Sequence, residues 1–224
     1  MDVYRTEEEQ VEAIKKWWQT NGNNVLIGIG LAIFVVFGWQ YWNDSKQAAG
    51  EAASLVYDQM LQASQKLAAA PADSDTYTTE LGNLNHLIDQ LKTDHKDTQY
   101  AVFAAMYEAK HAVEQGDGEK AEEALRWALQ NNQSEPNRLI IQLRLARVLA
   151  MKGEHQAALD MIEKIDAGAQ TSAYEEVKGD LYLALEQADK ARTAYKKALD
   201  AAGEEAQQRR PLLKMKYDNL AVAE

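Results

Sequence analysis

The chain has 224 residues, enough for one sizeable folded domain with its own hydrophobic core and further segments. Only three prolines and an abundance of Ala, Leu, Gln, Glu and Lys favour an all-α fold, because such residues lose little rotamer freedom in a helix. The absence of cysteine excludes disulfides and thiolate metal sites, and the formal net charge of −11, spread along the chain, argues against nucleic acid as a partner.

Residues 1–24 predict a short amphipathic arm. Thr6 and the three glutamates after it have the form of a capping box, so a helix is expected to begin there. An apolar stripe at helical spacing follows, which we expect to lie along the membrane surface or against a partner. Its members are Val11, Ile14, Trp17 and Trp18.

Residues 25–42, with the sequence VLIGIGLAIFVVFGWQYW, carry no charge and predict a single transmembrane helix. At 1.5 Å per residue this helix measures about 27 Å, close to the hydrocarbon thickness of a bilayer. Gly28 and Ala32, four residues apart, offer a close-packing face to another membrane helix. Aromatic side chains that favour the lipid headgroups follow at the end of the segment. They are Trp39, Tyr41 and Trp42.

Residues 25–42 have three alternative interpretations: a cleaved signal peptide, a buried helix of a soluble core and a dinucleotide-binding loop. A cleaved signal peptide needs a basic start and a shorter apolar core, whereas 24 residues with five acidic side chains precede this one. The small residues 48–50 that follow it leave cleavage open as an alternative. A buried helix of a soluble core needs only one apolar face, whereas residues 25–42 are apolar on all sides. Gly28 and Gly30 lack the third glycine and preceding strand of a dinucleotide loop.

Basic residues near the segment predict its orientation. Arg5, Lys15 and Lys16 precede it, whereas only Lys46 follows within fifteen residues. Because positive charge favours the cytoplasmic side, the N-terminus is expected in the cytoplasm and the rest of the chain outside it.

Three later segments share a pattern of small and large residues. A turn residue is followed after five positions by Ala, after four more by a large residue, and after three more by a small or apolar one. The segments are Gly116, Ala121, Leu125, Ala128; Gly153, Ala158, Ile162, Ile165; and Glu186, Ala191, Tyr195, Ala198. Their spacings of 37 and 33 residues bracket the 34 of the tetratricopeptide repeat, so a right-handed helical solenoid of this kind is predicted.

Each repeat also needs a first helix, and the expected first helices cover residues 101–115, 139–152 and 173–185. Residues 48–70 predict a long helix that continues from the membrane segment, and with residues 77–91 it forms a degenerate helical pair before the repeats. Pro211 opens a short helix that should cap the end of the repeats. The expected organisation is then an arm (1–24), a transmembrane helix (25–42), a repeat domain (43–204) and a capping helix (205–224).

The sequence shows no catalytic or metal-ligand constellation, so neither an enzyme nor a cofactor is predicted. Solenoids of this type bind segments of other proteins along the groove formed by their first helices. The residues projected onto that groove are Phe103, Met106, Lys110, Val113, Ile140, Leu143, Arg147, Met151, Glu176, Asp180 and Leu183. Their charge gradient favours apolar segments with basic flanks, although these residues can also simply pack between neighbouring helices.

Four stretches of sequence carry a resemblance to a known family. They are EQVEAIK at 9–15, GWQYWN at 38–43, LRLARV at 143–148 and MKYDNL at 215–220. With them the chain resembles, from end to end, the YfgM family, the ancillary SecYEG translocon subunits of Gram-negative bacteria. Glu186 stands where glycine is usual in the repeat, so groove residues are not carried over from the family.

The resemblance implies an inner-membrane protein with a periplasmic repeat domain that associates with the SecYEG translocon and with PpiD, a membrane-anchored periplasmic chaperone. Its implied role is to help pass newly translocated, still unfolded proteins to periplasmic chaperones. The alternative is a membrane-tethered regulator whose cytoplasmic arm holds a soluble stress-response regulator.

Overall fold

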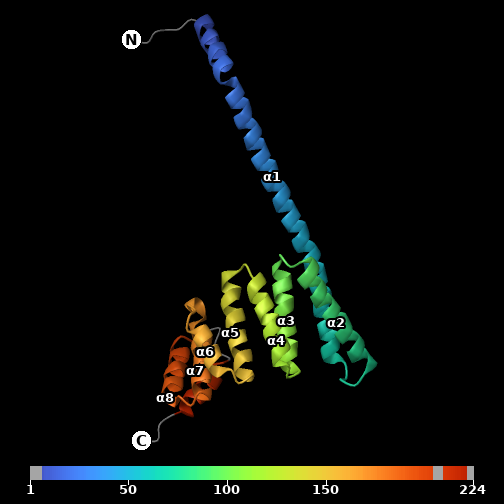
Figure 1. The fold of residues 1–224 in the computed structure, drawn as a ribbon, viewed down its shortest axis with the longest axis vertical. Helices are drawn as coiled ribbons and strands as arrows, with labels where there is room; N and C mark the ends of the chain where they lie inside the picture. The colour runs from blue at the N-terminus through green and yellow to red at the C-terminus, as the bar shows by residue number, and fades with distance from the viewer. Residues whose placement is uncertain (1–6, 204–208, 221–224) are drawn as a thin grey trace. The chain divides into compact units, whose positions relative to one another are not determined.

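The structure is a computed structural model that describes residues 7–203 and 209–220, and every regular element in these ranges is a helix (Figure 1). Its chain divides into two compact units, Met1–Glu51 and Ala52–Glu224. The predicted all-α class is therefore confirmed. The proposed capping residue Thr6 lies outside the described residues.

The first helix, α1 (Glu7–Ala69), is 63 residues long. Residues 48–70 were expected to continue the helix of the membrane segment, and the structure has one continuous helix that also includes the described part of the arm, because no proline interrupts it. This is the one described helix long and apolar enough, by length and composition, to cross a membrane, and none of its apolar window is buried. A core helix of a soluble protein would bury that window, so the segment is not one.

The second unit contains the end of α1 and a series of shorter helices that pack in chain order (Figure 1). They are α2 (Asp75–Asp94), α3 (Gln99–Glu114), α4 (Gly118–Asn131), α5 (Glu135–Met151), α6 (His155–Ile162), the 3-10 turn η1 (Gly168–Gln170), α7 (Thr171–Ala184), α8 (Ala188–Asp200) and α9 (Arg210–Asp218). In addition to its neighbours in sequence, α5 contacts α7, so the first helices of successive repeats lie side by side.

One turn geometry recurs at the end of α3, α5 and α7. The turn residues are Gly116 (φ 76°), Gly153 (φ 83°) and Glu186 (φ 59°), all in the left-handed region. After each, the next backbone N–H donates to the carbonyl five residues back, at 2.9, 2.9 and 2.8 Å. This is the Schellman motif, and its recurrence at the predicted spacings confirms that the three segments are structural repeats.

Glu186 is the one non-glycine residue with a positive φ among the described residues. Because a side chain is strained there, we expect Glu186→Gly to raise the free energy of unfolding by about 0.5–1 kcal/mol. Gly153→Ala, which adds a side chain at the equivalent turn, should lower it by about 1–2 kcal/mol. Urea unfolding of the full chain in detergent micelles measures the free energy of unfolding of both variants. A loss of stability in Glu186→Gly would contradict the conclusion that the backbone is strained at Glu186.

The last helix, α9, packs against α8 and is also held by charges on α7. Leu213 is completely buried, whereas Leu212 and Met215 are exposed. Arg209 pairs with Glu176, and Lys216 reaches Glu176 at 3.1 Å. The helix thus covers apolar surface at the end of the repeats.

Candidate functional site

A cavity of 380 Å³ opens between α3 and α5 above a floor from α4. Its lining residues define what we call the α3–α5 groove. They are Met106, Ala109, Lys110, Val113, Glu114, Leu125, Arg144, Arg147, Val148 and Met151. The volume is typical of sites that receive a few side chains of a ligand, and most of this lining is apolar.

Helical periodicity and repeat spacing together build this groove. On α3 the lining residues recur every three or four positions, as do those on α5, so each helix contributes one face. Lys110 and Arg147 are 37 residues apart, which equals the distance between the turns of their repeats. They therefore occupy the same position in successive repeats.

The structure brings five of the predicted groove residues together and places the others elsewhere. Met106, Lys110, Val113, Arg147 and Met151 line the cavity. The sequence interpretation missed Arg144, although its position three residues before Arg147 puts it on the same helical face.

Of the predicted residues outside the cavity, Leu143 is 4% exposed within the hydrophobic core. The ring of Phe103 lies 6.3 Å from that of Tyr57, and Ile140 lines a different cavity of 570 Å³ with residues of α5 and the segment after α6. Leu183 is exposed. Their role in binding stays a prediction.

Glu176 and Asp180 of α7 are paired within the protein. Lys216 of α9 lies 2.7 Å from Asp180, and the hydroxyl of Tyr195 donates to the same carboxylate at 2.7 Å. Since Glu176 is bound by Arg209 and Lys216, the acidic end of the expected charge gradient is neutralised by α9. The expectation of basic flanks in a partner therefore loses its basis.

The positive charges of the groove are less completely paired. Lys110 lies 3.6 Å from Glu114, but Arg144 and Arg147 have no hydrogen bond or ion pair within residues 7–203 and 209–220. Both guanidinium groups remain exposed, yet partial burial lowers their pKa. Repulsion from Arg147 adds to the lowered pKa of Arg144, whereas Asp180 partly opposes the effect at Arg147. Two partly desolvated cations thus face an apolar cavity.

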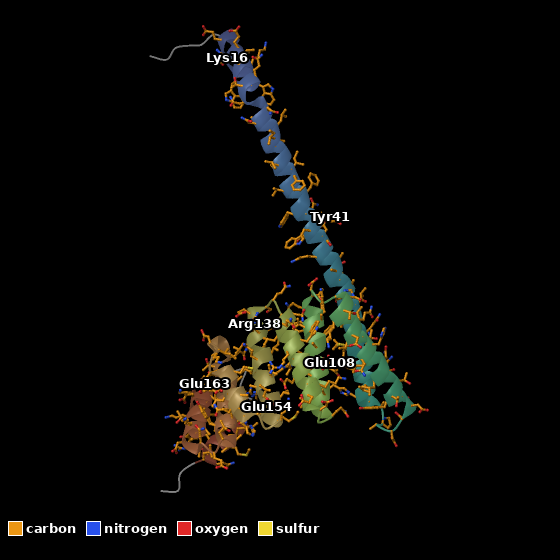
Figure 2. The ribbon with its side chains drawn as sticks, viewed as in Figure 1. Lys16, Tyr41, Glu108, Arg138, Glu154 and Glu163 are labelled. Carbon is orange, nitrogen blue, oxygen red and sulfur yellow. The ribbon has the colours of Figure 1, made fainter. Side chains whose placement is uncertain are left out.

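The first unit carries the other predicted site residues, and Figure 2 marks Lys16 and Tyr41 along α1. The arm residues are exposed, Val11 49%, Ile14 67%, Trp17 54% and Trp18 49%. At Gly28 a Cβ atom would meet nothing within 4 Å, so this face of the helix and Ala32 are open to a neighbour. Trp39, Tyr41 and Trp42 are exposed at the end of the apolar segment.

No group of acidic and histidine side chains in the described ranges is arranged to hold a metal ion.

Comparison with known proteins agrees with this architecture. Residues 15–222 match the tetratricopeptide repeat-like domain family, so the fold and its groove define a protein of the tetratricopeptide-repeat class. Three relatives that carry the name ancillary SecYEG translocon subunit align with essentially the whole chain. Those of Aggregatibacter actinomycetemcomitans and Haemophilus influenzae are 32% and 29% identical over 97% of this chain, and that of Escherichia coli is 26% identical over 99%. All three are covered over 100% of their own length.

The chain belongs to the family of ancillary SecYEG translocon subunits. No solved structure matches it.

Proposed function

We propose that this protein is a membrane-anchored scaffold that associates with the SecYEG translocon and helps pass newly translocated proteins to periplasmic chaperones. Its transmembrane helix lies in the inner membrane, its N-terminal arm in the cytoplasm and its repeat domain in the periplasm. PpiD, itself membrane-anchored, is the expected chaperone partner. The groove contacts this chaperone or the unfolded clients themselves.

One observation carries this proposal: a single helix contains both the apolar segment and part of the repeat domain. Residues 25–42 of α1 suit a bilayer, and further along the same helix Ala53, Met60 and Ala63 are buried in the core of the second unit. A groove tethered in this way stays close to membrane partners, which raises their effective concentration. The name that the relatives carry, ancillary SecYEG translocon subunit, supports the SecYEG translocon as such a partner.

Site-specific photo-cross-linking in living cells tests the proposal. A photoreactive side chain at Val113 or Met151, both exposed in the groove, should capture a periplasmic chaperone or newly translocated chains. The same group at Gly28 should capture translocon subunits. Ala157, exposed and outside the groove, is the matched control site. If none of the three classes of partner is captured at any of these positions, the proposal is wrong.

The exposed apolar stripe of the arm supports a second candidate function, in which the cytoplasmic arm holds a soluble stress-response regulator. Deletion of residues 2–16, which keeps the apolar segment and the repeat domain, separates the two functions. The regulator proposal predicts that this deletion abolishes the function. The scaffold proposal predicts that cross-links from the groove persist.

A further inference from the structure

We infer that the α3–α5 groove recognises apolar polypeptide segments that carry carboxylates, with Arg144 and Arg147 as the cations that pair with them. This inference rests on the proposed function and states the chemistry of the partner at the groove. The sequence alone suggested a preference for apolar segments with basic flanks, and the inference replaces it with a preference for acidic ones.

The apolar part of the preference comes from the walls of the cavity. Val113 is 40% exposed and Met151 46% exposed, although both are large apolar side chains. With Met106 and Val148 they line a cavity of 380 Å³. Burial of a partner's apolar side chains there removes these surfaces from water, and the flexible methionines adapt to different shapes.

The acidic part of the preference comes from the two arginines. Their guanidinium groups are partly desolvated, and neither makes a hydrogen bond or ion pair with a carboxylate in the described chain. Arg144 and Arg147 lie three residues apart on α5, so two acidic side chains of one segment can reach them together. A carboxylate at this position gains a charge-assisted hydrogen bond and relieves the repulsion between the arginines.

The third repeat shows how such a surface binds a helix of opposite charge. Asp180 follows Arg147 by 33 residues, the spacing of their turns, and it receives Lys216 of α9 at 2.7 Å. Leu213 of the same short helix is fully buried. At the second repeat the equivalent residue is Arg147, which forms no hydrogen bond or ion pair with any described residue. The matching segment therefore carries an acidic residue beside its buried apolar one.

Net charge makes the inference sharply testable. With a formal charge of −11 the protein as a whole attracts basic peptides and repels acidic ones. A preference for acidic peptides therefore has to come from the local arginines rather than from the general field.

The test uses the full chain in detergent micelles and fluorescently labelled peptides of about 12 residues, roughly three helical turns. Three peptides share the same Leu and Ala residues and carry two Glu, two Gln or two Lys three positions apart. We expect the Glu peptide to bind at least about tenfold more tightly than either of the others. The double variant Arg144→Gln and Arg147→Gln should lose this advantage but bind the Gln peptide as before. Arg138→Gln is the control, because Arg138 lies on α5 outside the groove and pairs with Glu135 at 3.0 Å.

A charge reversal keeps the test decisive if the glutamine variant is poorly folded. Arg144→Glu together with Arg147→Glu should shift the preference to the Lys peptide. Equal affinity of the wild-type protein for all three peptides, or no binding of any of them, overturns the inference. If the inference is overturned but cross-links from Gly28 to translocon subunits persist, the proposed function stands. If those cross-links are absent while the protein still prefers the Glu peptide, the proposed function fails and the inference about the groove stands.

Discussion

Gly179→Ala is expected to lower the free energy of unfolding by about 2–3 kcal/mol, even though alanine is the better helix former. A Cβ atom at Gly179 would lie 2.4 Å from Cε1 and 2.5 Å from Cδ1 of Tyr195. These contacts are far inside van der Waals distance. The ring has little freedom to move, because it is 1% exposed and its hydroxyl donates to Asp180 at 2.7 Å.

The position explains why the repeat needs a small residue on its first helix. Ala109 and Ala146 are buried at the equivalent positions, where the large residue of the second helix is Leu125 or Ile162 rather than a tyrosine. The aromatic ring of the third repeat leaves room for glycine alone. The contact between α7 and α8 at this point thus depends on the absence of a side chain at Gly179 and on the ring of Tyr195.

Urea unfolding of the full chain, followed by circular dichroism in detergent micelles, measures the effect. Gly82→Ala is the matched control, because Gly82 lies within α2 with nothing within 4 Å of its Cβ position, and it should gain up to about 1 kcal/mol. In a Tyr195→Leu background the cost of Gly179→Ala should largely disappear. Equal losses in both backgrounds would show that the ring is not the cause.

Leu213→Ala is the second change with a large expected effect, a loss of about 2–4 kcal/mol. Leu213 is completely buried and belongs to a helix of nine residues, which is too short to be stable without tertiary contacts. Truncation leaves a cavity and weakens the attachment of α9. Lys216, which pairs with Glu176 and Asp180, would then be held less firmly.

Leu212→Ala provides the internal comparison, because the neighbouring leucine is 46% exposed and its truncation should change stability by less than about 0.5 kcal/mol. Thermal or urea unfolding of both variants gives the difference. Two variants of equal stability would mean that α9 does not cover the end of the repeats as the structure shows.

The repeats were predictable from the sequence because their signals are local. Small and large residues at fixed offsets place the turns, and the turn at Glu186 adopts the same left-handed geometry although it lacks the usual glycine. The apolar segment was equally clear, since length and the absence of charge are properties of a single stretch.

The groove was only partly predictable, because its composition depends on how each helix is rotated against its neighbours. Leu143 and Arg144 are adjacent in sequence, but the first is buried and the second lines the cavity. The pairing of Asp180 with Lys216 joins residues 36 positions apart, which no local pattern signals. That pairing changes the charge of the surface left for a partner.

The most direct test of the central claim is the accessibility of the arm and of the repeat domain in intact spheroplasts. Because the chain has no cysteine, single substitutions can be labelled specifically with a membrane-impermeant maleimide. Ala157→Cys in the repeat domain should react in intact spheroplasts, whereas Glu9→Cys in the arm should react only after lysis; both native residues are exposed. The opposite pattern, or labelling of both before lysis, would contradict a helix that separates a cytoplasmic arm from a periplasmic groove.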